Sequence, residues 1–154
     1  MPFQRAQVTR LTKPFSPKMV QQKPGSFAAN YVGHPRVVEK LIAVLGPFDW
    51  EITQLIKEAD GTVTGCIGKL TVTIDGRVTT VSEVGDVEDP SGNAPAKNNG
   101  ARAKDASSDA IKRAAMRLGC GLELWVKGDP VLHAALVKEG EIVDPVEADD
   151  GDPS

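Results

Sequence analysis

Apolar residues alternate with polar ones through the middle of the chain. Between residues 62 and 74 the apolar positions include Cys66, Leu70, Val72 and Ile74, all of them at even-numbered places. A period of two is typical of a β-strand that buries one face. The pattern therefore predicts a strand over residues 62–74.

The segments on both sides of that strand predict two partners for it. Asp75 and Gly76 form a dipeptide typical of a two-residue hairpin turn, so residues 77–84 are expected to return as an antiparallel strand. Residues 50–56 predict an earlier strand. Three consecutive strands joined in this way form an antiparallel meander.

Two amphipathic helices flank the meander in the sequence. Pro35 suits the first turn of a helix over residues 36–45, and Gly46 ends it. Residues 101–118 predict a longer helix with Gly119 as its C-terminal cap. The first helix is expected to bury one side, made of Val37, Val38, Leu41, Ile42, Val44 and Leu45.

The longer helix carries arginines on one side. At 100° per residue, Arg102, Arg113 and Arg117 lie within about 60° of one another. Each guanidinium can form two hydrogen bonds to phosphate oxygens, so three of them in a row suit a polyanion, although a solvated charged face is the alternative. A separate stripe about 100° away is suited to packing on the sheet: Ala103, Ser107, Ile111, Ala114 and Leu118.

The order of helix, three-stranded meander and long helix predicts an α+β fold with a β-β-β-α core, in which the long helix packs on the sheet. Pattern alone does not separate this order from that of double-stranded RNA-binding domains. Residues 1–30 contain several prolines and are expected to be mostly extended, with a short turn of helix. Residues 86–100 predict a loop, residues 121–127 a short strand or irregular segment, and residues 130–137 a short helix.

Composition places the chain among ordinary globular proteins. Its 154 residues are 40% hydrophobic and 25% charged, which suits one domain with its own core. No apolar run approaches the length of a bilayer span or of a signal-peptide core, so we expect a cytoplasmic protein with no membrane partner. Cys66 and Cys120 are then expected to be reduced, buried thiols.

Charge is unevenly distributed along the chain. Residues 1–38 contain no acidic residue, whereas residues 139–154 contain seven acidic residues and no basic one, within a net charge of −3. We therefore expect an extended basic segment over residues 1–26, a folded domain over residues 27–138, and an acidic disordered tail over residues 139–154. Such a tail competes with nucleic acid for a basic surface or recruits partners, or it serves solubility alone.

No set of residues predicts catalysis or a cofactor. His34 is expected to make a hydrogen bond at the start of a helix, because no nucleophile or carboxylate partner accompanies it in the sequence. The two cysteines and two histidines lack the spacing of metal ligands, and the glycines form no phosphate-binding loop that would indicate an ATPase. A divalent metal site is the alternative to a solvated loop for four carboxylates: Asp75, Asp86, Glu88 and Asp89.

Four segments of the chain follow one another in an order typical of one protein family. They are residues 31–41 (Tyr-Val-Gly-His-Pro-Arg-Val-Val-Glu-Lys-Leu), residues 45–50 (Leu-Gly-Pro-Phe-Asp-Trp), the meander, and residues 112–119 (Lys-Arg-Ala-Ala-Met-Arg-Leu-Gly). Together they resemble the DNA-annealing domain of the Rad52 family of single-strand annealing proteins. The resemblance covers residues 27–125, with Pro35 as an extra residue relative to the family pattern.

The resemblance implies an assembly and a set of DNA-binding residues. In that family the domain forms rings or arcs, and single-stranded DNA lies in a basic groove with its bases exposed for pairing. The resemblance assigns Arg36, Lys112 and Arg113 to the inner part of the groove. Arg117 follows Met116, which occupies the place of a further basic residue of the family. The nearby candidates for the outer part of the groove are Lys69, Lys97, Arg102 and Lys104.

We therefore expect residues 27–138 to form a single-strand annealing domain of a phage or bacterial protein. It would be a non-enzymatic recombinase mediator without cofactor or metal, which anneals complementary DNA strands without ATP in homologous recombination and DNA repair. Its partners would be single-stranded DNA, further copies of itself in a ring or arc, and a single-strand binding protein or recombinase held by the tail. The alternatives are a protein that coats DNA ends without annealing, a small metal-dependent nuclease, and a double-stranded RNA binder.

Overall fold

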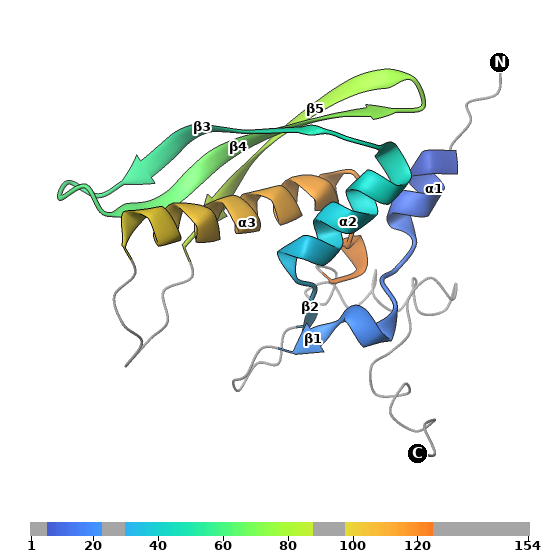
Figure 1. The fold of residues 1–154 in the computed structure, drawn as a ribbon, viewed down its shortest axis with the longest axis horizontal. Helices are drawn as coiled ribbons and strands as arrows, with labels where there is room; N and C mark the ends of the chain where they lie inside the picture. The colour runs from blue at the N-terminus through green and yellow to red at the C-terminus, as the bar shows by residue number, and fades with distance from the viewer. Residues whose placement is uncertain (1–5, 23–29, 88–97, 125–154) are drawn as a thin grey trace.

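The computed structural model describes residues 6–22, 30–87 and 98–124 (Figure 1). The expected α+β order of helix, three-stranded meander and long helix is confirmed. The expected helix over residues 130–137 and the acidic tail lie outside the described residues. In chain order the elements are α1 (Ala6–Thr12), the 3-10 helix η1 (Pro17–Met19), the short strands β1 (Gln21–Gln22) and β2 (Asn30–Tyr31), α2 (His34–Leu45), β3 (Asp49–Lys57), β4 (Val63–Ile74), β5 (Arg77–Asp86), α3 (Asn99–Arg117) and the 3-10 helix η2 (Leu122–Leu124).

The strands β3, β4 and β5 form an antiparallel sheet in that order. Asp75 and Gly76 make the turn between β4 and β5 with φ angles of 50° and 78°, as the predicted two-residue hairpin requires. β5 continues past its predicted end because Gly85 and Asp86 still pair with β4. The predicted meander is thus present, with a longer last strand.

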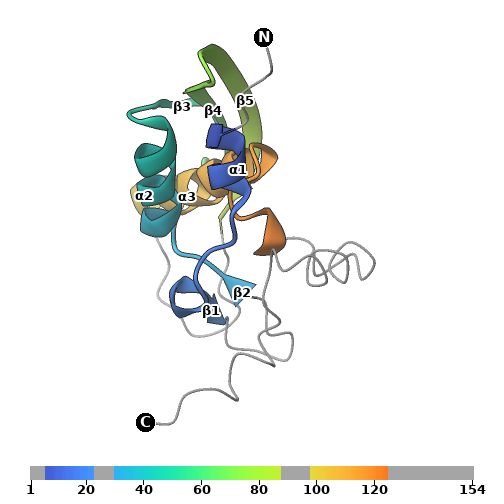
Figure 2. The same ribbon diagram turned by 90° about the vertical axis from the view of Figure 1, so that its right-hand side faces the viewer.

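The helix α3 runs along one face of the sheet, beneath β4 and β5 (Figures 1 and 2). Ala106, Ala110 and Ala114 are fully buried in α3. Gly85 of β5 permits this close approach, because a Cβ there would overlap the carbonyl oxygen of Ala106 and the backbone of Ala110. Small residues on both elements therefore set the distance between the helix and the sheet.

The buried stripe of α3 is broader than the predicted stripe, because Ala106 and Ala110 extend it toward the arginines and Ala115 extends it on the other side. Ile111 is buried as predicted, but Ala103 and Ser107 are only half-buried, and Ala106 occupies the buried face. Ser107 instead accepts a hydrogen bond from Nε1 of Trp50 at 2.9 Å. The prediction was wrong on this point because the sequence pattern does not reveal how closely Gly85 lets the helix approach.

The helix α2 ends at Leu45 as predicted, begins two residues before the predicted range, and packs against α3 and α1. Pro35 lies in its first turn, and Gly46 follows its last residue with a φ of 79°. Val37 and Leu41 are buried, whereas Ile42 is 49% exposed and corrects the prediction that it would be buried. The buried face of α2 is thus narrower than the sequence predicted.

The N-terminal segment contains a helix where the sequence predicted mostly extended chain. Leu11 of α1 is fully buried in the core. Gln7 donates from Nε2 to the carbonyl oxygen of Val44 at 3.3 Å, and its Oε1 accepts from the backbone nitrogen of Asp75 at 2.6 Å. α1 therefore joins the end of α2 to the β4–β5 hairpin.

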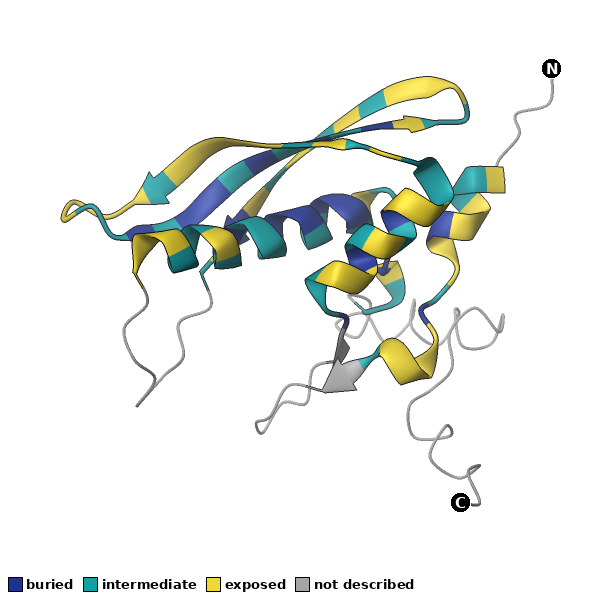
Figure 3. Cartoon of the chain, in the orientation of Figure 1, coloured by how far each residue is buried: buried dark blue, intermediate teal, exposed yellow. Residues whose placement is uncertain are grey.

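Burial is concentrated on the side of the sheet that α3 covers (Figure 3). Cys66, Leu70 and Val72 of β4 are buried, while the alternate residue Lys69 points to the uncovered face. Cys66 and Cys120 are free and buried, as predicted. No helix within the described residues is long and apolar enough to cross a membrane.

Candidate nucleic-acid interface

One candidate arginine of α3 is held in place through a carboxylate that also contacts the sheet. Nε of Arg113 donates to Oδ2 of Asp109 at 2.9 Å. The same oxygen accepts from the backbone nitrogen of Asp86, at the end of β5, at 3.0 Å. Asp109 therefore orients Arg113 from the sheet side, while the arginine side chain stays 37% exposed.

Arg117 lies on the same side of α3, one helical turn later. Its Nη1 donates to the carbonyl oxygen of Ser82 in β5 at 3.1 Å and lies 3.7 Å from Oε2 of Glu83. Its side chain is 56% exposed. Arg113 and Arg117 therefore form a pair of partly exposed guanidinium groups along the β5 side of α3.

Arg102 has a different role near the beginning of the same helix. Its Nε donates to the carbonyl oxygen of Val63, the first residue of β4, at 2.5 Å. This bond fastens the N-terminal end of α3 to the sheet. The structure therefore gives Arg102 an anchoring function within the fold.

Lys112 points to another side of α3 from Arg113, because neighbouring residues on a helix are about 100° apart. Ser108, one turn before Lys112, places its Oγ 3.3 Å from Nδ1 of His34 at the start of α2. Burial lowers the pKa of His34 below its ordinary value of 6.5, and the positive charge of Lys112 lowers it further. Lys112 therefore lies in the electrostatic environment of His34, at the contact between the two helices.

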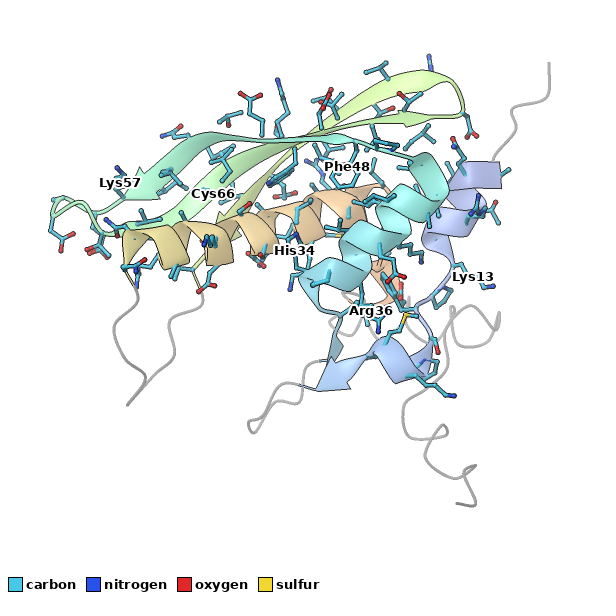
Figure 4. All side chains as sticks on the ribbon, viewed as in Figure 1. Lys13, His34, Arg36, Phe48, Lys57 and Cys66 are labelled. Carbon is cyan, nitrogen blue, oxygen red and sulfur yellow. The ribbon has the colours of Figure 1, made fainter. Side chains whose placement is uncertain are left out.

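Arg36 follows His34 in the first turn of α2 (Figure 4). Its Nη1 lies 3.2 Å from Oε2 of Glu39, and the two side chains are 52% and 65% exposed. Exposed ion pairs of this kind contribute only about 0–1 kcal/mol. A phosphate can therefore replace Glu39 as the partner of Arg36 at little cost.

The remaining candidates lie apart from these groups. Lys69 is on the uncovered face of the sheet, with its Nζ 3.6 Å from Oε2 of Glu51. Lys104 is exposed on α3, and Lys97 lies outside the described residues. The structure does not bring Lys69 to the cations of α3, because the sheet separates them.

The two described carboxylates of the candidate metal site, Asp75 and Asp86, do not come together. Asp75 precedes β5 and Asp86 ends it, which separates them by roughly 30 Å along an extended strand. Glu88 and Asp89 lie outside the described residues. Among the residues that the structure describes, no group of three or more His, Cys, Asp or Glu side chains is placed to hold a metal ion.

Three residues of the candidate site were not predicted: Asp109 and Glu83, which contact the arginines, and Ser108, which contacts His34. The spacing of Asp109 and Arg113, four residues apart on a helix, was a usable signal for their ion pair. The contacts of Ser108 and Glu83 join segments that are distant in the sequence, so no local pattern reveals them. The resulting arrangement presents cations from two helices and is suited to binding an extended anion.

Comparison with known proteins adds one match. A family model described as Rad52/22 family double-strand break repair protein matches residues 4–129. That range contains every described element from α1 to η2. A search of curated proteins finds no match to this sequence.

Proposed function

Because the chain belongs to the Rad52/22 family of double-strand break repair proteins, a family of DNA repair and recombination, we propose that it binds single-stranded DNA and anneals complementary strands without ATP. Arg36, Lys112, Arg113 and Arg117 bind the phosphates in this proposal. The protein acts by binding alone, with no catalytic residue.

The pair formed by Arg113 and Arg117 is the observation that carries the proposal. Both guanidinium groups are attached to a helix that is packed on the sheet, and both remain partly exposed. An annealing protein must hold the phosphates while leaving the edges of the bases free for pairing. Cations on fixed elements meet this requirement, because they contact the DNA backbone without reading the bases.

The aromatic side chains support the same conclusion. Phe15, Phe48 and Trp50 pack against the hydrophobic core. They are therefore poor platforms for stacking DNA bases, the interaction on which many single-strand binding proteins depend. Bases that are not stacked on the protein remain available to a complementary strand.

We also propose that copies of the chain assemble into a ring or arc. Within the described residues, the outer edges of β3 and β5 have no strand partner. Large apolar side chains are exposed on the same strands, including Ile52, Leu55 and Val78, and on α2 at Ile42. A neighbouring copy would cover this apolar surface.

The acidic tail has a separate role in the proposal. Residues 139–154 carry seven carboxylates and no basic group. We propose that this segment competes with DNA for the cations of α2 and α3 and releases them when it binds a single-strand binding protein or a recombinase. The basis is charge complementarity between the tail and these cations.

Annealing of two complementary fluorescent oligonucleotides in the absence of nucleotide tests the proposed function. Wild type is expected to accelerate annealing, and Lys112→Ala and Arg113→Ala are each expected to slow it about tenfold or more, because each removes a charged hydrogen bond worth about 1.5–3 kcal/mol. Lys57→Ala is the matched control, since Lys57 is an exposed lysine at the end of β3 (Figure 4).

Three results would contradict parts of the proposal. Acceleration that survives both substitutions would place the DNA site elsewhere on the protein. Tight binding of single strands without acceleration would indicate a protein that coats DNA ends. Magnesium-dependent cleavage of the oligonucleotides would indicate a nuclease.

A further inference from the structure

The contact between the start of α2 and the middle of α3 holds a histidine that the proposed DNA site has not used. Nδ1 of His34 lies 3.3 Å from Oγ of Ser108. His34 is only partly buried. Of the proposed phosphate ligands, Arg36 follows it by two residues on α2, and Lys112 of α3 acts on it through its charge.

Charged residues of both helices lie within about one helical turn of this contact. On α3 these are Asp105, Asp109 and Lys112, of which Asp109 pairs with Arg113. On α2 they are Arg36 and Glu39, which pair with each other. Lys112 is the charged group that acts on His34: after burial, its positive charge is the second cause of the lowered pKa of the imidazole.

We propose that His34 is a further phosphate-binding residue of the DNA site, and that it takes up a proton when a phosphate binds between it and Lys112. The proposal rests on the function proposed above and adds a pH dependence to it. A neutral imidazole donates one hydrogen bond, whereas an imidazolium donates from both ring nitrogens and carries a positive charge. A phosphate at this place would offset the charge of Lys112 and favour the imidazolium.

The direction of the pH effect follows from proton linkage. In the free protein, burial and the charge of Lys112 lower the pKa of His34 and so favour the neutral imidazole. In the complex the negative phosphate raises that pKa. DNA binding therefore takes up a proton between the two pKa values, and affinity rises as the pH falls through this interval, by at most about tenfold per pH unit for one proton.

Affinity for fluorescent oligothymidylate, measured from pH 5.5 to pH 8.0 at constant ionic strength, tests the proposal. The bases of this probe do not titrate in the range. Wild type is expected to bind several-fold more tightly at the acidic end, and His34→Gln is expected to lose most of this gain, so that its affinity changes little between pH 5.5 and pH 8.0. His133→Gln is the matched control, because the chain has only two histidines, and it should keep the wild-type pH profile.

The proton resonances of the imidazoles report the pKa of His34 directly, so this second measurement leaves His34 itself unsubstituted. The His34 pKa is expected to rise when oligothymidylate is added and to rise in free Lys112→Met, which lacks the neighbouring charge. An unchanged His34 pKa on binding, or an unchanged pH profile in His34→Gln, would overturn the role of His34 while leaving DNA binding intact. Absence of oligothymidylate binding by wild type even at pH 5.5 would instead overturn the proposed function itself, and the inference with it.

Discussion

Single residues decide how closely the two layers of this fold approach each other. Gly85 lies under α3 where a side chain would meet the backbone of that helix, and Gly68 lies under the ring of Trp50 in the same way. Gly68 lies within a predicted strand and Gly85 directly follows one, but the need for glycine depends on α3 at Gly85 and on the ring of Trp50 at Gly68. The cations of α3 reach β5 because this approach is so close.

The substitution Gly85→Ala tests whether the close approach of α3 to β5 requires glycine at this position. The added methyl group would overlap the carbonyl oxygen of Ala106 and force α3 away from the sheet. We expect the free energy of unfolding to fall by about 1–3 kcal/mol, the usual cost of overpacking a core. Thermal or urea unfolding followed by circular dichroism measures the change.

A control for this substitution lies nearby on the same strand. Ser82 is exposed on β5, so Ser82→Ala should change the free energy of unfolding by less than about 0.5 kcal/mol. Equal stability of Gly85→Ala and wild type would show that the contact of α3 with β5 is looser than the structure has it.

At the scale of elements, the sequence predicted what depends on local pattern. The strands β3 and β4, the Asp75-Gly76 turn and the two long helices follow from alternation, turn residues and caps, and all are present. For residues 1–30 the sequence predicted mostly extended chain with a short turn of helix, without placing the helix α1. The prolines of this segment lie outside α1, and the helix is stabilised by contacts of Gln7 and Leu11 with distant elements.

In the candidate site, too, the sequence predicted what depends on local pattern and missed what depends on distant contacts. The spacing of Arg113 and Arg117 places them on one side of a helix. The contact of Arg117 with β5, and that of Arg113 with Asp109, which accepts from Asp86 of β5, agree with that placement. The position of Lys112 beside His34 depends on how α2 crosses α3, which the sequence pattern leaves open. Tertiary packing thus determines which cations become neighbours.

At the scale of the whole molecule, charge is divided between a folded body and the acidic residues at the end of the chain. If residues 139–154 compete with DNA, truncation after Lys138 should tighten binding of single-stranded DNA several-fold at low salt. The gain should fade as salt rises, because counterions screen the competing carboxylates. Fluorescence anisotropy of a labelled oligonucleotide measures both effects. Equal affinities of the truncated and full-length proteins at every salt concentration would indicate that the tail serves solubility alone.

The salt dependence of single-stranded DNA binding is the most direct test of the central claim, that cations on α2 and α3 bind the phosphates. The logarithm of the association constant falls with the logarithm of the salt concentration by about 0.7 for each neutralised phosphate. For the double variant Lys112→Met with Arg113→Met, the account predicts a slope shallower by about 1.4 than that of wild type. Lys57→Met should keep the wild-type slope. A wild-type slope in a double variant that still folds would contradict the assignment of these residues to the DNA site.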